Sequence, residues 1–167
     1  MKTWMKRFWW SLAILVVSGG LYWFLTRPLP GETVVNQGRE HVVDITDFAY
    51  NSNPPVSGPH FADWTRTGKY EQELNDGNLI HSLEHGYIIV SHNCELSANC
   101  DQLKTDLKSF YDKHSQDRLI VVPRSGMDSA VILTAWNRFL RLADWDQAQA
   151  EAFFKAWHNL GPERTME

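Results

Sequence analysis

The sequence predicts an α+β protein, with helices on a mostly antiparallel or mixed sheet, preceded by one N-terminal transmembrane helix. Three observations predict this class: a long charge-free stretch near the start, short β-branched runs mixed with helical apolar spacing, and a proline-rich stretch between them. Such a mixture of strands and helices is typical of α+β folds. We expect residues 1–27 to be a cytoplasmic N-terminus and anchor, residues 28–40 a linker, and residues 41–167 one soluble extracytoplasmic domain.

The charge-free stretch, residues 8–26, predicts a membrane anchor. Its 19 residues, FWWSLAILVVSGGLYWFLT, are about enough to cross a bilayer, and aromatic residues lie near both ends. Three basic residues precede it and only Arg27 follows closely, which places the C-terminal domain outside the cytoplasm by the positive-inside rule. The following LTRPLPG is a poor cleavage site, so a retained single-pass anchor in the inner or plasma membrane is favoured over a cleaved signal.

Charge argues against a nucleic-acid partner. Residues 1–27 hold 4 of the 16 basic residues and no acidic ones, so residues 28–167 carry 12 basic and 20 acidic side chains, a net charge of −8. An acidic domain repels phosphate backbones and attracts cations. We expect a membrane and a metal ion as partners and no nucleic acid, and the sequence identifies no protein partner.

The domain's elements follow from local pattern. Apolar and β-branched runs predict strands over residues 41–46, 87–92, 119–122 and 130–136. Helical spacing predicts helices over residues 97–114 and from Asp146, where Gln149 supplies a capping-box pattern. Three prolines exclude a helix or central strand from residues 51–60, NSNPPVSGPH. The order β-α-β-β-α also describes the C-terminal part of a thioredoxin-like arrangement.

The two cysteines, Cys94 and Cys100, predict a disulfide. A nearby pair oxidises outside the cytoplasm. The C-x5-C spacing differs from the C-x-x-C of redox enzymes, so we favour a structural disulfide over a redox pair or metal thiolates.

The sequence HSLEHG, which begins at His81, carries the strongest chemical signal. His81 and His85 are four apart and share a face of a helix or a strand, whereas Glu84 joins them only in a helix. A capping residue at 75–76 and a left-handed Gly86 would delimit a short helix. The spacing also matches the inverted zincin signature, but a strand directly after Gly86 leaves no room for a long zincin helix.

Four segments resemble the domain of unknown function 3105 family. In order they are YNSNPPVSGPHF (50–61), LIHSLEHGYIIV (79–90), AVILTAWNR (130–138) and GPE (161–163). The family contains small, often membrane-anchored bacterial proteins of unestablished function. The resemblance covers residues 41–163, and it implies which positions belong to the site but little about the chemistry there. It points to His60 alongside His81 and His85. Asn137 replaces a family glycine, which concerns only the local backbone.

Three imidazoles from two segments are the beginning of a metal-coordination shell. Glu84 and His92 are candidate further ligands, and Met127 is the most favoured fourth ligand if the ion is copper. Thioether with imidazoles favours Cu(I), whereas imidazoles with a carboxylate or water favour Zn(II). The predicted metal ligands are His60, His81, His85 and Met127.

We therefore expect a membrane-anchored extracytoplasmic protein that binds a copper or zinc ion through a histidine cluster. Two alternatives stay open. One is a small metal-dependent hydrolase, with Glu84 as the general base. The other is a non-catalytic structural or interaction domain, in which the histidines form a hydrogen-bond network. His41, His114 and His158 are interpreted as surface or packing residues.

Overall fold

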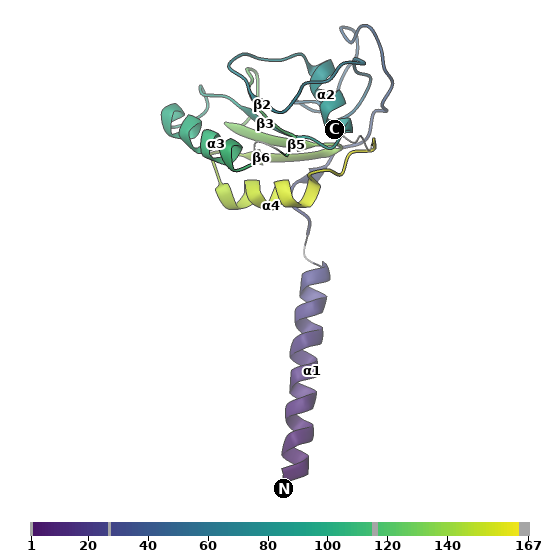
Figure 1. The fold of residues 1–167 in the computed structure, drawn as a ribbon, viewed down its shortest axis with the longest axis vertical. Coiled ribbons are helices and arrows are strands. Elements are labelled where there is room, and N and C mark those ends of the chain that lie inside the picture. Colours follow the sequence, from purple (N-terminus) through teal and green to yellow (C-terminus); the bar gives the residue numbers. More distant parts are fainter. Residues whose placement is uncertain (1, 27, 115–116, 164–167) are drawn as a thin grey trace.

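The computed structural model describes residues 2–26, 28–114 and 117–163 (Figure 1). Within these ranges the chain forms four helices and a six-stranded mixed sheet, which confirms the α+β class. The helices are α1 (Lys2–Thr26), α2 (Asp76–Glu84), α3 (Cys100–His114) and α4 (Gln147–Trp157). The strands are β1 (Glu32–Thr33), β2 (Gly68–Lys69), β3 (Ile88–His92), β4 (Leu119–Pro123), β5 (Val131–Ala135) and β6 (Arg138–Leu142).

The sheet has the strand order β1-β6-β5-β3-β4-β2. β3 and β4 are parallel and are connected through α3, whereas β5 runs antiparallel to β3 and to β6. In the centre, Ile89 lies opposite Ile120 on one side and Thr134 on the other. Every residue of β3 and β5 is buried, as expected for apolar strands covered on both faces.

Alternate side chains of the central strands pack in two apolar cores, one on each face of the sheet. Ile88 and Val90 belong to the core that contains residues of α3 and α4, such as Phe110 and Phe153. Ile89 belongs to the other core, together with Leu83 of α2 and its neighbours. The sheet is therefore a central layer between α3 and α4 on one side and α2 on the other (Figure 1).

The domain differs from the sequence-based prediction mainly in its strands. Residues 41–46 do not form a strand; they make only an isolated bridge between His41 and His60. Val43 is fully exposed, and β-branched composition without a neighbouring strand to pack against does not produce a sheet. The sheet also gains β6, which follows β5 through a turn where Asn137 has a φ of 59°.

The predicted membrane anchor, and with it the single-pass membrane localisation, is contradicted. Residues 8–26 do lie in a helix, α1, which extends away from the sheet (Figure 1). However, among the residues that the structure describes, no helix combines the length and apolarity that a bilayer span needs. The prediction relied mainly on the absence of charge, whereas a span requires a helix that is both long and sufficiently apolar. Arg27, the predicted boundary residue, lies outside the described residues.

Strand pairing, a side-chain hydrogen bond and a disulfide fix the segments that flank the sheet. Residues 28–40, predicted as a linker, contribute β1, which pairs with β6, and the indole of Trp157 donates a hydrogen bond to the Pro30 carbonyl at 2.8 Å. Cys94 and Cys100 form the predicted disulfide, with their Cα atoms 5.0 Å apart.

Candidate metal centre

The short helix α2 carries the polar side chains of HSLEHG, and local sequence defines both of its ends. The Asn75 side chain accepts a hydrogen bond from the Gly77 amide at 2.8 Å and so caps the start of the helix. After the last turn, Gly86 has a φ of 85°, the left-handed conformation that glycine commonly adopts there. The helical alternative is confirmed, and Glu84 therefore lies on the same side of the helix as His81.

A second segment brings His60 to this helix, and His41 comes with it. The Val42 amide donates to the His60 carbonyl at 2.8 Å, and the His60 amide donates to the Glu40 carbonyl at 2.9 Å. These two bonds form the isolated parallel bridge between His41 and His60. The pairing fixes His41 beside a histidine that is 19 positions away in the sequence.

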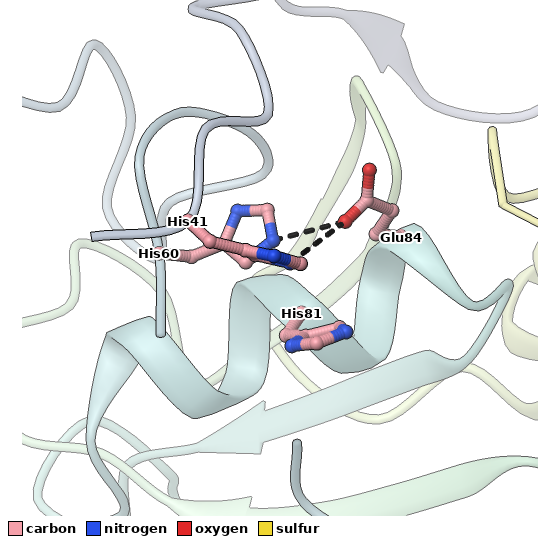
Figure 2. Close-up of side chains that lie close together, drawn as sticks. All are labelled: His41, His60, His81 and Glu84. Carbon is pink, nitrogen blue, oxygen red and sulfur yellow. Dashed lines mark hydrogen bonds and ion pairs between the residues drawn. The ribbon is translucent and has the colours of Figure 1, made fainter. Parts of the chain in front are cut away.

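Four side chains converge at this point and are called the quartet below (Figure 2). They are His41, His60, His81 and Glu84. Each offers one nitrogen or oxygen atom that lies within 4.8 Å of the other three. The three imidazole rings have centroids 4.8, 5.0 and 5.1 Å apart. One hydrogen bond orients the carboxylate: Oε2 of Glu84 lies 2.9 Å from Nε2 of His60, and Nε2 of His41 lies farther from it, at 3.9 Å.

Backbone carbonyls hold the Nδ1 atoms of two of these rings. Nδ1 of His60 lies 2.8 Å from the Gly58 carbonyl, and Nδ1 of His81 lies 2.8 Å from the Phe61 carbonyl. A carbonyl oxygen can only accept a hydrogen bond, so each Nδ1 carries a proton and donates it. A ring that is protonated only on Nδ1 has its lone pair on Nε2. In His81 this atom faces Nε2 of His85 at 3.0 Å, and in His60 it faces Glu84, with a further proton between the two atoms. Metal-ligating histidines are held by the same second hydrogen bond.

Three members of the quartet are buried, and the fourth is partly exposed to solvent. His60, His81 and Glu84 have relative exposures of 0%, 4% and 3%, whereas the His41 side chain is 48% exposed. Oε1 of Glu84 lies 3.6 Å from the Arg39 guanidinium, which is itself exposed. His41 is therefore the member of the quartet that solvent reaches.

Burial sets the protonation of the central imidazole. The pKa of His81 is lowered chiefly because burial disfavours the charged ring, and the neighbouring rings of His85, His60 and His41 add to this effect. The hydrogen bond to the Phe61 carbonyl opposes it only in part. His81 is therefore neutral at pH 7, which is the form that binds a metal ion.

A second group of possible ligands shares His81 with the quartet. Nε2 of His85 lies 3.0 Å from Nε2 of His81 and 3.7 Å from a carboxylate oxygen of Glu163. These three residues also offer ligand atoms within 4.8 Å of one another. Because the Nδ1 proton of His81 is used by a carbonyl, its single Nε2 lone pair can serve one ion at a time.

The C-terminal segment holds Glu163 in this position. The Glu163 amide donates to the Glu84 carbonyl at 3.1 Å, and the Asn159 amide donates to the Gly86 carbonyl at 2.9 Å. Gly161 lies directly against this backbone: a Cβ there would come within 2.0 Å of the Glu84 carbonyl oxygen. Only glycine permits such an approach, so residues 159–163 form a strap across the end of α2.

The predicted ligands are only partly brought together. His60 and His81 belong to the quartet, and Glu84, a candidate further ligand, joins them. His85 lies next to His81 but belongs to the second group. Met127 is buried with a relative exposure of 7% and belongs to the apolar core that contains Leu79 and Leu83 of α2.

Three further positions show the limits of sequence reasoning. His41, predicted as a surface or packing residue, lies in the quartet, and Glu163 is a member of the second group. No local signal marks His41, because its bridge to His60 depends on two segments that meet only in the fold. Glu163 belongs to the GPE segment that carried the family resemblance. His92, a candidate ligand, lies elsewhere, in a pocket at the end of β3.

Comparison with known proteins agrees with the resemblance in the sequence. The sequence model of one family, described as "Protein of unknown function (DUF3105)", matches residues 41–167. No curated protein and no solved structure matches the chain. The match covers the whole of the sheet except β1, together with the quartet, the second group and the disulfide. This chain therefore belongs to the family of proteins of unknown function DUF3105.

Proposed function

We propose that this protein binds a divalent transition-metal ion, best matched by zinc, through His41, His60, His81 and Glu84. One observation carries the proposal: four donor atoms of metal-binding type lie within 4.8 Å of one another, three of them on buried side chains. A tetrahedral zinc ion with bonds of about 2.0–2.2 Å separates its ligand atoms by about 3.3 Å. Modest side-chain rotations would close the quartet on such an ion.

The hydrogen bonds around the quartet also support this proposal. Two of the imidazoles are oriented by carbonyls through Nδ1, which leaves Nε2 for an ion. The 2.9 Å contact between His60 and Glu84 holds one proton between a nitrogen and an oxygen atom. A metal ion would take the place of that proton, so binding would release it to solvent.

The donor set favours zinc over copper. Three imidazoles and a carboxylate suit Zn(II), whereas Cu(I) prefers thioether or thiolate sulfur. The predicted sulfur ligand, Met127, is packed in an apolar core. Four protein ligands also fill a tetrahedral shell, which is typical of ions that are stored, carried or structural.

A metal-dependent hydrolase is the second candidate function, and the exposure of His41 favours it. If His41 gave way to water, two histidines and Glu84 would leave one open position, as in catalytic zinc sites. Glu163, 3.7 Å from His85 at the edge of the site, would then be the available general base.

Metal binding is tested by titrating the full chain with zinc in competition with a chromophoric chelator, together with metal analysis of the purified protein. Wild type is expected to bind one zinc ion. His60→Ala and His81→Ala are expected to weaken binding at least about 100-fold, more than the loss of a supporting group around a metal. His114→Ala is the matched control, because that histidine contacts Glu151 on another face of the domain.

Two results would overturn the proposal. One is a wild type that takes up neither zinc nor copper at stoichiometric level. The other is equal weakening by His114→Ala, which would show binding to dispersed surface histidines. His41→Ala separates the two candidate functions: a carrier loses zinc affinity, whereas a hydrolase keeps zinc and still activates water.

A further inference from the structure

A second site lies outside the metal centre, at the ends of the parallel strands β3 and β4. It is a pocket of about 330 Å³, within the size range of small-molecule sites. Its lining includes His92 and Pro123, the last residues of the two strands. In sheets with parallel strands, ligands commonly bind beyond the carboxyl ends of those strands.

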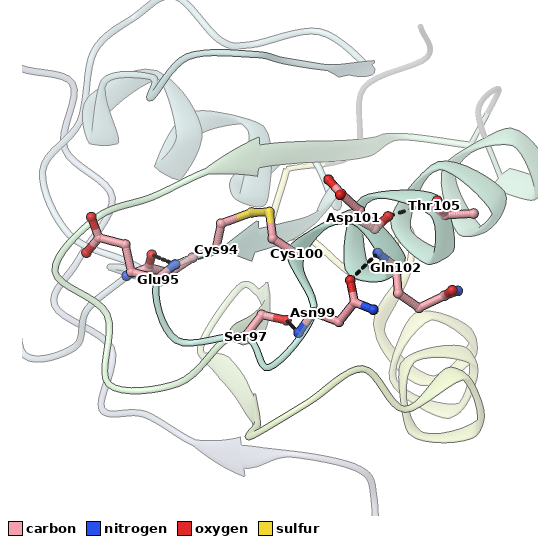
Figure 3. The surroundings of a disulfide bond; sticks show 9 residues. Cys94, Glu95, Ser97, Asn99, Cys100, Asp101, Gln102 and Thr105 are labelled. Atoms are coloured by element: carbon pink, nitrogen blue, oxygen red, sulfur yellow. Dashed lines mark hydrogen bonds between the residues drawn. A yellow bond between two sulfur atoms is a disulfide. The ribbon is translucent and has the colours of Figure 1, made fainter.

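The disulfide borders this pocket, and its two sulfur atoms have different surroundings (Figure 3). Cys94 follows β3 closely and lines the pocket. Cys100 is the first residue of α3, a helix of 15 residues, whose start is capped by Asn99 through a bond of 3.1 Å to the Gln102 amide. A helix N-terminus stabilises a cysteine thiolate and lowers its pKa.

A buried histidine in the pocket has an atom without a partner. His92 has a relative exposure of 8%, lines the pocket, and its Nδ1 makes no hydrogen bond to any described residue. Burial is the main reason that its pKa is lowered, and a contact with the Val122 backbone opposes this effect only in part, so the ring is neutral at pH 7 and able to accept a proton. Unpaired buried polar atoms are rare in proteins, and this one lies two positions before Cys94.

A basic side chain completes the arrangement. Lys104 lies four residues after Cys100 on α3, on the same side of the helix, and it lines the pocket. A nearby ammonium group stabilises a thiolate in the same sense as the helix N-terminus. Sequence spacing alone favoured a purely structural disulfide. The fold instead places the pair between a pocket, a neutral imidazole and a helix N-terminus.

We propose that this pocket is a site of thiol–disulfide exchange, in which Cys94 is attacked by a small thiol. The thiolate of the incoming molecule forms a bond to Sγ of Cys94, the Cys94–Cys100 bond breaks, and Cys100 leaves as a thiolate at the start of α3. The proton of the incoming thiol passes to Nδ1 of His92. The leaving thiolate is the better stabilised of the two, which speeds exchange.

A second thiol molecule completes the reaction. It attacks the substrate sulfur of the mixed disulfide and releases Cys94 as a thiol. The sum is two thiols oxidised to one disulfide, while the Cys94–Cys100 pair accepts two electrons. One of the two protons ends on Cys94, and the other passes from His92 to solvent while Cys100 stays a thiolate. The disulfide of the protein is itself the oxidant.

The pocket indicates the kind of thiol. It is lined by cationic and anionic side chains in equal number: Lys69, Lys104, Arg124, Glu71, Glu73 and Glu95. A lining of both signs suits a small zwitterionic thiol, and the volume suits a molecule of roughly tripeptide size. Reduced glutathione is a probe with these properties.

The test uses the full chain under native conditions, with glutathione as the reductant, acid quenching, alkylation and peptide mass mapping. The expected product is a glutathione adduct on Cys94, formed at a rate proportional to glutathione concentration, with tryptophan fluorescence unchanged. His92→Gln is expected to slow both directions by at least about ten-fold while leaving the equilibrium constant unchanged. A purely structural histidine would not produce that combination.

Lys104→Gln provides an independent measurement. It removes a charge that stabilises the Cys100 thiolate, so the equilibrium with glutathione is expected to shift toward the protein disulfide by about two- to five-fold. Lys108→Gln is the matched control, because Lys108 lies one turn further along α3 and pairs with Asp112 outside the pocket. It is expected to change neither rate nor equilibrium.

Three outcomes would overturn the proposal. The first is reduction at a rate independent of glutathione and equal to the rate of global unfolding, as for a structural disulfide. The second is an adduct on Cys100 instead of Cys94. The third is a rate unchanged by His92→Gln, together with an equilibrium unchanged by Lys104→Gln.

Discussion

The Nε2 atom of His60 lies 2.9 Å from Oε2 of Glu84, and these side chains are 0% and 3% exposed. A hydrogen bond to a charged group in such surroundings contributes more than a neutral one, because water does not compete for it. The same pair of atoms supplies two of the four corners of the proposed zinc site. In the protein without metal, this contact keeps the Glu84 carboxylate from being buried without a partner.

Glu84→Gln is expected to destabilise the chain even without metal. Glutamine has nearly the same shape but no negative charge, so the charge-assisted hydrogen bond to His60 is lost. The free energy of unfolding should fall by about 1.5–3 kcal/mol, measured by urea denaturation in the presence of a chelator. Glu163→Gln is the control: its side chain is 45% exposed, and the change should stay within about 0.5 kcal/mol. Equal denaturation midpoints for Glu84→Gln and wild type would contradict this account of the contact.

Stability is expected to fall on mild acidification. Burial is the main cause of the lowered pKa values of His81, His92 and His158. In the unfolded chain these rings take up a proton near pH 6.5, whereas in the folded chain they stay neutral to lower pH. Below about pH 6.5 the unfolded state therefore binds more protons, so stability is fully present above that pH and declines as the pH falls towards the folded pKa values.

His158→Gln tests this sign. Urea denaturation of wild type and variant at pH 7.5 and pH 5.5, with a chelator present, compares the two losses. The variant should lose less stability over this interval, because one of the three rings no longer titrates. The Glu151 carboxylate, whose pKa is lowered from 4.5, loses its contribution only in a more acidic range. A wild type that becomes more stable at pH 5.5 would show that the sign is wrong.

Gly161→Ala is expected to displace the strap across α2. The added Cβ would come within 2.0 Å of the Glu84 carbonyl oxygen and 2.3 Å of the Gly86 amide nitrogen. These are backbone atoms that cannot rotate away, so the free energy of unfolding should fall by about 1–3 kcal/mol. Gly20→Ala is the matched control, because nothing lies within 4 Å of that position in α1. Thermal denaturation compares the two variants. Equal melting temperatures would mean that the strap can move to accommodate the Cβ with no loss of stability.

Local chemistry was enough to predict several parts of the fold. The helix over Asp76–Glu84 follows from the cap at Asn75 and the left-handed Gly86, both of which act within a few residues. Strands β3, β4 and β5 follow from short apolar, β-branched runs. The start of α4 follows from Asp146, which accepts a hydrogen bond from the Gln149 amide at 3.0 Å. Each of these signals depends on backbone hydrogen bonding or burial along one stretch of chain.

The sequence by itself determined that His81 and His85 share one face whether a helix or a strand forms, and that Cys94 is close enough in sequence to pair with Cys100; the family resemblance pointed to His60. Only the tertiary structure decided which other residues surround them. The bridge to His60 places His41 in the quartet, and Met127 packs in the apolar core. Residues far apart in sequence meet only when sheet and loops pack together, and that packing depends on the whole chain's shape rather than on any local spacing.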